Sequence, residues 1–395
     1  SLEYIVRERK KEKKEMDFVA PFRAAGVRKF HKTIPVYQET PLISLEGLSK
    51  ELGVSKVWIK DESKRFGLHA FKGLGGSYAI AACLAKMLGK SINEMTFEQL
   101  CAPEAKEKLG TLTFVTATDG NHGRGVAWAA RLFGHKAVVY MPKGSSQERL
   151  SNIRAQGAQA EITPYTYDDA VRLAKKMAEE HGWILVQDTA WEGYEEIPSY
   201  IMQGYTTMAE EIREQLKEER PTHLFLQAGV GSFAGAMLGY FVQLFGADYP
   251  TTVIMEPDKA CCHYDTVKAD DGKLHFSTGP MDSMMAGLCC GEPCTLSFHI
   301  IDTYADAFVS CSDEYSADGM RLLGNSERKE EIVVSGESGA VGAGVLAGIM
   351  KEKNLKELRD QLKLGKDSKV LLISTEGDTD QENYKRILNQ IQAGS

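Results

Sequence analysis

The chain has 395 residues, of which 43% are hydrophobic and 26% charged, and its formal net charge is -8 with a pI of about 5.7. This length allows two domains that share a cleft, and the composition is that of a globular protein. The acidic balance argues against nucleic acid or an anionic membrane as a partner. No apolar run approaches the roughly 20 residues that a transmembrane helix needs.

The first residues lack the apolar core of a secretory signal peptide. They carry instead a dense run of charges from Arg7 to Lys14, which favours a solvated helical arm of mixed charge. A cytoplasmic location is therefore expected.

The eight cysteines do not form the pattern of a disulfide scaffold. Five of them fall within one stretch: Cys261, Cys262, Cys289, Cys290 and Cys294. They lack C-x-x-C spacing and His263 has no partner in the sequence, so no metal site is expected. Small buried side chains are the simplest interpretation, and a redox-sensitive pair between the 261–262 and 289–290 segments stays open.

Strand and helix patterns alternate along most of the chain. Apolar, β-branched segments predict strands at residues 57–59, 112–117, 137–142, 159–162, 183–187, 222–227, 252–256 and 370–373. Helical patterns follow at 73–84, 126–132, 145–154, 170–180, 197–216 and 232–244, and after 336, with residues 167–169 as a cap and 261–294 irregular. This alternation predicts an α/β fold with parallel sheets covered by helices on both faces.

Lys72 stands between a loop and the start of an apolar helix, directly after Phe71 and before Gly73. A helix N-terminus and partial burial both disfavour the ammonium form, so we expect a lowered pKa and a more nucleophilic amine. A lysine that forms a Schiff base needs these properties. The alternative is a lysine that merely extends from a helix end into solvent.

A glycine-rich loop, Gly229-Val230-Gly231-Ser232 with Gly235 beyond it, follows a predicted strand and opens a helix. Such a loop can offer backbone N–H groups to a phosphate, although tight packing is an alternative. Its G-x-G-x-x-x-G spacing and the lack of a well-placed acidic residue argue against a dinucleotide-binding oxidoreductase. Together with the candidate lysine, the loop suggests a cofactor with both an aldehyde and a phosphate, as in pyridoxal phosphate.

The set of Phe71-Lys72, Gly120-Asn121-His122-Gly123, Gly229-Val230-Gly231-Ser232 and Ser374 resembles fold-type II pyridoxal-phosphate enzymes. Longer segments look like the diaminopropionate ammonia-lyase family: HAFKGLGGSYA, TATDGNHGRGVAWAA, QAGVGSFAGAMLGY, SGESGAVGAGVLA and ISTEGDTD. The resemblance extends from about residue 30 to residue 382.

The resemblance implies roles for individual residues. Lys72 would form the Schiff base, and Asn121 would hydrogen-bond the phenolic oxygen of the cofactor. The phosphate would be held by Gly229, Val230, Gly231, Ser232 and Gly235. Ser374 or its neighbour Thr375 would meet the pyridine nitrogen, and Glu337 would lie near the ring or have a structural role. A homodimer is also implied.

The chain departs from the related dehydratases near the lysine and the asparagine of the predicted site, and it carries a further carboxylate. This chain has Asp119 where they place a small neutral residue, Ala70 where they usually have serine, and Asp188 at a neighbouring strand end. Carboxylates beside a substrate carboxylate are costly unless the substrate also brings a cation. The β-ammonium of 2,3-diaminopropionate meets that condition.

The resemblance assigns Asp119 as the base for the D-isomer of 2,3-diaminopropionate and Asp188 as the base for the L-isomer. Each residue has a structural alternative. Asp119 could be a helix N-cap, and Asp188 could be a supporting hydrogen-bond acceptor. For His122, packing or support of a neighbour is the main expectation.

The sequence thus predicts a fold-type II enzyme with a large domain (1–78 and 191–395) and a small mobile domain (79–190), with the cofactor between them. The expected reaction is α,β-elimination of an amino acid substrate, 2,3-diaminopropionate, to pyruvate and two ammonia. A serine/threonine dehydratase is the alternative within enzymes, and a non-catalytic sensor of amino acids or of pyridoxal phosphate is the alternative outside them.

Overall fold

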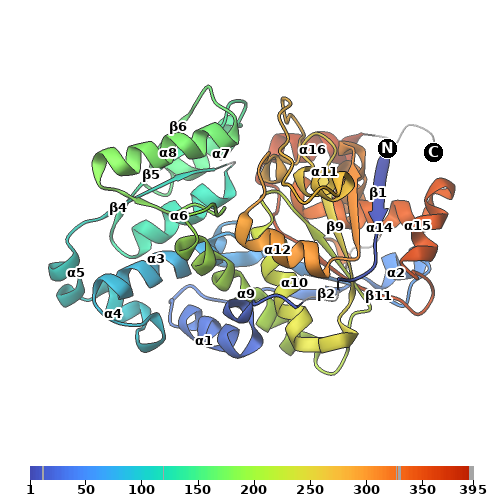
Figure 1. The fold of residues 1–395 in the computed structure, drawn as a ribbon, viewed down its shortest axis with the longest axis horizontal. Coiled ribbons are helices and arrows are strands. Elements are labelled where there is room, and N and C mark those ends of the chain that lie inside the picture. Colours follow the sequence, from blue (N-terminus) through green and yellow to red (C-terminus); the bar gives the residue numbers. More distant parts are fainter. Residues whose placement is uncertain (11–12, 119, 326, 328–330, 391–395) are drawn as a thin grey trace.

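The computed structural model describes residues 1–10, 13–118, 120–325, 327 and 331–390. In this part of the chain the strands form two sheets (Figure 1). The larger has seven strands in the order β1-β10-β9-β8-β11-β3-β2, and the smaller has four in the order β6-β5-β4-β7. Among the described residues, no helix combines the length and apolar character needed to cross a bilayer.

The large sheet is parallel except at its two edges. Its five inner strands run parallel, whereas β1 and β2 pair antiparallel with their neighbours. Inner strands such as β8 are buried along their whole length, as expected for a sheet with helices on both faces. The strands are β1 (Leu2–Val6), β2 (Leu42–Ser44), β3 (Lys56–Asp61), β8 (His223–Gln227), β9 (Thr251–Pro257), β10 (Ala307–Cys311) and β11 (Lys369–Ser374).

The small sheet is wholly parallel. Its strands are β4 (Thr113–Ala117), β5 (Lys136–Met141), β6 (Gln159–Ile162) and β7 (Ile184–Leu185). It lies at the upper left of Figure 1 with three helices: α6 (Asn121–Leu132), α7 (Gln147–Arg154) and α8 (Tyr167–His181).

The remaining helices lie around and between the two sheets (Figure 1). They are α1 (Pro21–Lys32), α2 (Glu46–Leu52), α3 (Gly73–Met87), α4 (Phe97–Cys101), α5 (Pro103–Leu109), α9 (Glu196–Leu216), α10 (Ser232–Phe245), α11 (Cys262–Ala269), α12 (Thr295–Tyr304), α13 (Asp313–Gly324), α14 (Glu337–Lys351), α15 (Lys356–Gln361) and α16 (Gln381–Asn389). Helix α3 packs against both α6 and α9, so it links the two sheets.

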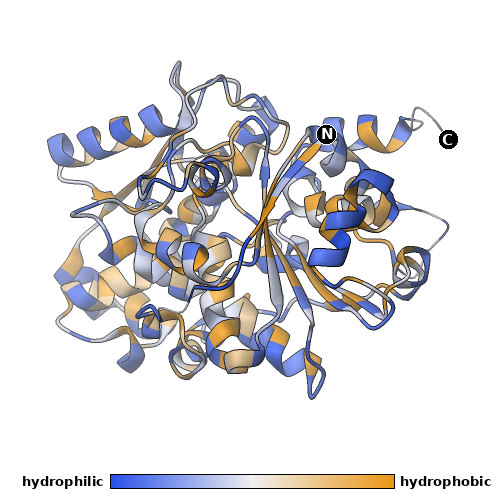
Figure 2. Ribbon diagram, turned by 45° about the vertical axis from the view of Figure 1, so that its right-hand side comes forward, coloured by the Kyte–Doolittle hydropathy of each residue, from blue (hydrophilic) through white to orange (hydrophobic). Residues whose placement is uncertain are grey.

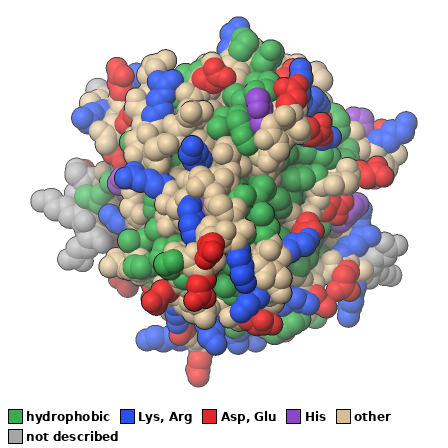
Figure 3. Space-filling view, turned by 90° about the vertical axis from the view of Figure 1, so that its left-hand side faces the viewer, with side chains coloured by type: hydrophobic (Ala, Val, Ile, Leu, Met, Phe, Trp, Pro, Cys, Tyr) green, Lys and Arg blue, Asp and Glu red, His purple; other side chains and the backbone are tan. Residues whose placement is uncertain are grey.

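Hydrophobic residues concentrate in the strands of the large sheet and on the inward faces of the helices, while the outward faces are hydrophilic (Figure 2). On the face shown in Figure 3, acidic and basic side chains are interspersed and neither sign dominates. The molecule thus follows the layered pattern of α/β proteins.

Most predicted strands and helices are confirmed, with four corrections. The 183–187 strand is shorter, since only Ile184–Leu185 is a strand. Residues 167–169 are not a cap but the first turn of α8, which Thr166 caps. The 261–294 stretch is not wholly irregular, because it contains α11.

The fourth correction concerns the charged N-terminal segment, which is not helical in the part described. Residues 2–6 form the edge strand β1. Beyond it, the Arg7 and Arg9 side chains pair with Asp302 and Asp306. Pairing with fixed carboxylates therefore replaces the solvated arm that composition alone favoured.

A wholly buried ion network connects β3 to α9. Lys60 Nζ lies 2.9 Å from Glu211 Oε1, and Arg65 Nη2 lies 2.8 Å from the same oxygen. Arg65 Nη2 also lies 2.9 Å from Glu62 Oε2. Burial alone would raise the pKa of Glu211, but Arg65 and Lys60 together lower it to about 2. The network ties β3 and the segment directly after it to α9.

We predict that Glu211→Gln lowers the free energy of unfolding by about 3–5 kcal/mol, because it leaves the buried charges of Lys60 and Arg65 without their shared partner. Urea unfolding measures this change. The exposed pair of Lys86 and Glu196 provides the control: Glu196→Gln should leave the unfolding midpoint nearly unchanged. An equally small loss for Glu211→Gln would contradict the prediction.

The depressed pKa of Glu211 also fixes the sign of a pH effect. Stability from this carboxylate is fully present above its usual pKa of 4.5 and is lost as the pH falls toward about 2. In Glu211→Gln this part of the acid destabilisation should be absent.

Candidate functional site

One cavity lies at the carboxyl ends of the parallel strands, where open α/β sheets bind their ligands. It brings together residues far apart in the sequence: Lys72, Asn121, Asp188, Gly229, Val230, Gly231, Ser232 and Thr375. Most of the residues that the sequence singled out therefore share one site. Asp119 lies outside the described residues.

Lys72 directly precedes helix α3, at its N-cap position, and its side chain is only 15% exposed. Its Nζ donates a hydrogen bond to Asp188 Oδ2 over 3.2 Å. A carboxylate at this distance favours the ammonium form of a lysine. The structure thus adds an ion pair that the sequence did not reveal, and a lowered pKa of Lys72 stays a prediction.

Asp188 is buried and its two oxygens face different partners. Oδ1 accepts a hydrogen bond from the Tyr167 hydroxyl over 2.9 Å, while Oδ2 faces Lys72. Oδ2 also lies 4.0 Å from Nδ1 of His122. Burial would raise the pKa of Asp188, but His122, Lys72 and the Tyr167 hydroxyl hold it well below its usual value. Asp188 is therefore an anion in this site.

His122 is buried, and its Nε2 lies 2.9 Å from the carbonyl oxygen of Val186, the residue directly after β7. This arrangement agrees with the expected supporting role. The ring stands beside Asp188 rather than among the residues that line the cavity.

The glycine loop leads from β8 into α10. Gly231 has φ +99°, and a Cβ there would lie 2.6 Å from Nε2 of His263, so this position requires glycine. The N–H groups of Gly229, Val230 and Gly231 donate no hydrogen bond to any residue that the structure describes. Ser232 begins α10, where helix geometry leaves the first N–H groups unbonded. These donors suit a phosphate.

The role predicted for Gly235 in holding the phosphate stays a prediction. The Gly235 N–H donates to the Gly231 carbonyl oxygen over 2.8 Å, as part of the helix. A Cβ at this position would lie 2.5 Å from Cβ of Ser297. Close packing of α10 on α12 therefore explains the glycine.

The structure separates the two hydroxyl candidates at the end of β11. Thr375 lines the cavity, and its Oγ1 accepts a hydrogen bond from Gln227 Nε2 over 3.1 Å. Ser374 instead bonds to the Ser335 hydroxyl over 2.7 Å and does not line the cavity. Successive side chains of a strand point to opposite faces, which accounts for the difference.

Asn121 lines the cavity, and its Nδ2 donates to Glu376 Oε2 over 2.5 Å. Glu376 is buried and lies close to Glu337. Burial and the charge of Glu376 raise the pKa of Glu337 to about 7, although the charge of Arg149 opposes this rise. Arg149 lies 3.6 Å from Glu337. Glu337 is not among the residues that line the cavity.

None of the eight cysteines, all of which lie within the described residues, is in a disulfide, so no such bond joins the 261–262 and 289–290 segments. Within the described residues, one group of potential metal ligands gathers: Glu256, Cys262 and His263. Glu256 already accepts hydrogen bonds from the N–H groups of His263 and Tyr264 at the start of α11. Capping of this helix accounts for the group.

Three residues of the site were missed by sequence reasoning. Gln227 and Glu376 border residues that were recognised, so their positions at strand ends could have drawn attention to them. Tyr167 had been interpreted as part of a cap, and its contact with Asp188 spans 21 positions without any sequence pattern.

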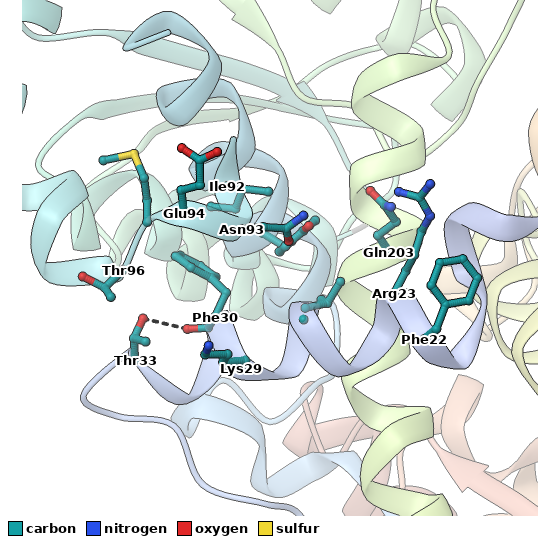
Figure 4. Close-up of a pocket in the computed structure, with 14 residues that line it drawn as sticks. Phe22, Arg23, Lys29, Phe30, Thr33, Ile92, Asn93, Glu94, Thr96 and Gln203 are labelled. Carbon is teal, nitrogen blue, oxygen red and sulfur yellow. Dashed lines mark hydrogen bonds between the residues drawn. The ribbon is translucent and has the colours of Figure 1, made fainter. Parts of the chain in front are cut away.

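A larger cavity of about 700 Å³ lies elsewhere, between α1, α9 and residues 92–96. Figure 4 shows Arg23, Lys29 and Phe30 on α1, with Asn93 and Glu94 opposite and Gln203 on α9. It lacks the close lysine–carboxylate pair of the first cavity, which is therefore the better candidate for catalysis.

The first cavity fits pyridoxal phosphate by its donor set. It combines a mostly buried lysine, free N–H groups at a helix start, an asparagine amide and a threonine hydroxyl. The cofactor's aldehyde, phosphate and ring substituents require these types of group.

Comparisons with known proteins also indicate an enzyme that uses pyridoxal phosphate. Residues 34–376 match the family model described as "Pyridoxal-phosphate dependent enzyme". A diaminopropionate ammonia-lyase from Salmonella typhimurium is 53% identical over 363 residues, covering 91% of this chain and 90% of the relative.

Two crystal structures of the Escherichia coli diaminopropionate ammonia-lyase are similar to this chain. The complex with D-serine has a TM-score of 0.91 and 45% identity, covering 98% of this chain and 97% of that one. The complex with an aminoacrylate-PLP azomethine reaction intermediate has a TM-score of 0.89 and 45% identity, with the same coverage. The chain is thus a fold-type II enzyme that uses pyridoxal phosphate, and it belongs to the diaminopropionate ammonia-lyase family.

Proposed function

We propose that this enzyme converts both isomers of 2,3-diaminopropionate to pyruvate and two ammonia by α,β-elimination. The observation that carries the proposal is the anionic Asp188 beside Lys72 in the cofactor cavity, in a member of this family. The β-amine leaves as the first ammonia. Hydrolysis of the released aminoacrylate consumes one water and yields pyruvate and the second ammonia.

Bound pyridoxal phosphate supplies an electron sink for the negative charge that develops at the substrate α-carbon. Lys72 would hold the aldehyde carbon, and the N–H groups of Gly229, Val230, Gly231 and Ser232 would hold the phosphate. Asn121 and Thr375 would orient the ring through the phenolic oxygen and the pyridine nitrogen. A neutral hydroxyl beside that nitrogen suits elimination better than transamination.

Asp188 would remove the α-proton of the L-isomer, and Asp119 that of the D-isomer. A general base must lie within hydrogen-bond distance of the proton that it removes. Asp188 Oδ2 lies 3.2 Å from Lys72 Nζ, the group that would hold the cofactor. The substrate's β-ammonium would offset the cost of placing its carboxylate near these anions. The dehydratase alternative lacks such a cation, which is why we rank it second.

The two-domain division at residues 78/79 and 190/191 is also a proposal, supported by the separate sheets. Closure of the small domain on substrate would exclude water. Eight cysteines without a disulfide among the described residues support a reducing, cytoplasmic environment. We further propose a homodimer, on the strength of the family.

The substrate profile tests the proposed activity. Ammonia and pyruvate should appear in a 2:1 ratio from D- and L-2,3-diaminopropionate, with D-serine, L-serine and L-threonine turned over more slowly. Coupled assays for both products measure the ratio. Faster turnover of serine or threonine would make the enzyme a dehydratase.

The link to the cofactor is tested by borohydride reduction followed by mass spectrometry of peptides. The wild type should carry the cofactor on Lys72, and Lys72→Ala should lose both this adduct and turnover, because no other amine takes its place. Lys64→Ala, at an exposed lysine on the same segment, should retain both. An adduct on another lysine would refute the assignment.

The two-base reading is tested by amide substitutions. Asp188→Asn should lower kcat/KM for L-2,3-diaminopropionate by roughly 10²–10⁴-fold, the usual contribution of a general base, and should affect the D-isomer much less. Asp119→Asn should show the reverse selectivity. Asp168→Asn is the matched control, because this half-buried carboxylate accepts a hydrogen bond from the Gly291 N–H and does not line the cavity. Equal losses for both isomers in both variants would contradict the assignment.

A further inference from the structure

We propose that Tyr167 is a positioning residue for Asp188, which holds one carboxylate oxygen so that the other faces Lys72 and the substrate α-carbon. This inference rests on the proposed function, because it concerns the base for the L-isomer. It predicts that Tyr167 determines turnover of one stereoisomer only.

The contact geometry separates the two oxygens of Asp188. The Tyr167 hydroxyl donates to Oδ1 over 2.9 Å, whereas Oδ2 accepts from Lys72 Nζ over 3.2 Å. A carboxylate turns easily about its last side-chain bond, since that torsion has broad minima. The tyrosine hydroxyl makes the shorter of the two hydrogen bonds to Oδ1, since Gln187 Nε2 donates to the same oxygen over 3.3 Å. Together they select one orientation and leave Oδ2 on the reactive side.

Tyr167 is itself held by Gln187. Gln187 Nε2 lies 3.0 Å from the Tyr167 hydroxyl oxygen and 2.8 Å from the Ala117 carbonyl oxygen. Gln187 Oε1 accepts from the Ala117 N–H over 2.9 Å. The hydroxyl is thus tied through one amide to the end of β4, a rigid buried strand.

The hydroxyl remains a donor across the working pH range. Burial and the neighbouring Asp188 charge raise the pKa of Tyr167 well above its usual value, so the phenol stays protonated. The ionisable groups that face this pair come from several elements: Lys72 before α3, His122 on α6, and Asp168 and Cys290 beside Tyr167.

Loss of the hydroxyl should weaken Asp188 in two ways. The carboxylate loses its orientation, and a buried anion loses one donor, which raises its pKa. Because hydrogen bonds to charged groups are the strong ones, Tyr167→Phe should lower kcat/KM for the L-isomer by roughly 10- to 100-fold. The D-isomer, served by Asp119, should change less than about threefold on the same scale.

The pH profile gives a second readout. Activity with the L-isomer falls on the acid side as its base is protonated. A raised pKa of Asp188 moves this acid limb to higher pH in Tyr167→Phe, while the limb for the D-isomer stays in place. A tyrosine with only a packing role would move neither limb.

Tyr194→Phe is the matched control. The half-buried Tyr194 hydroxyl does not bond to Asp188: it donates to the Leu185 carbonyl oxygen over 2.6 Å and accepts from the Gln187 N–H over 3.0 Å. Its loss should affect both isomers equally. An isomer-specific loss in Tyr194→Phe, or an equal loss for both isomers in Tyr167→Phe, would overturn the proposal.

3-Fluorotyrosine placed at residue 167 provides a second test of the hydroxyl if the phenylalanine variant does not fold. A more acidic phenol is a stronger donor, so the acid limb for the L-isomer should move to lower pH. A shift in the other direction, or none, would refute the role.

The Asp188→Asn variant separates a wrong role for Asp188 from a wrong role for Tyr167. If it spares the L-isomer, the proposed role of Asp188 fails and this inference fails with it. If it removes L-isomer turnover while Tyr167→Phe does not change it, only the positioning role of Tyr167 is refuted.

Discussion

The buried ion network of Lys60, Glu62, Arg65 and Glu211 is the constraint on which the site depends. It anchors the segment that leaves β3 to α9, before the chain reaches Lys72. This segment contains two non-glycine residues with positive φ, Phe66 at 54° and His69 at 58°. Such conformations cost free energy and persist only where the surroundings enforce them. Four fully desolvated charges provide that enforcement.

Charge balance organises the site itself. Lys72 and Asp188 neutralise one another, and the Tyr167 hydroxyl and His122 ring surround the anion. When Lys72 engages the cofactor aldehyde, its positive charge beside Asp188 must be replaced. A substrate that carries a second ammonium group does so, whereas a hydroxyl-bearing substrate does not. The selectivity of the site would thus follow from charge balance among buried groups.

Much of the fold could be predicted from the sequence because strand and helix periods are local. The position of Lys72 before a helix, and of Gly229 after a strand, followed from that local pattern and was confirmed. Gly235 could not be resolved in the same way. A glycine that cradles a phosphate and a glycine that admits a neighbouring helix look alike in a sequence, and the contact with Ser297 is seen only in the structure.

The remaining gaps in the site prediction have the same origin, since they concern contacts between distant segments. Whether Ser374 or Thr375 faces the cofactor depends on the register of β11 within the sheet. That Asn121 bonds to Glu376 depends on how the two sheets are placed relative to one another. That Tyr167 bonds to Asp188 depends on how α8 packs beside β7.

The place of β11 in the large sheet has a consequence for how the protein is made. This strand lies between β8 and β3, although both precede it by a long stretch of chain. Until residues 369–374 emerge from the ribosome, β3 and β8 keep open edges and the wall that bears Thr375 is missing. Cofactor capture must therefore follow synthesis of β11, and the nascent chain must keep two apolar strand edges from pairing wrongly until then.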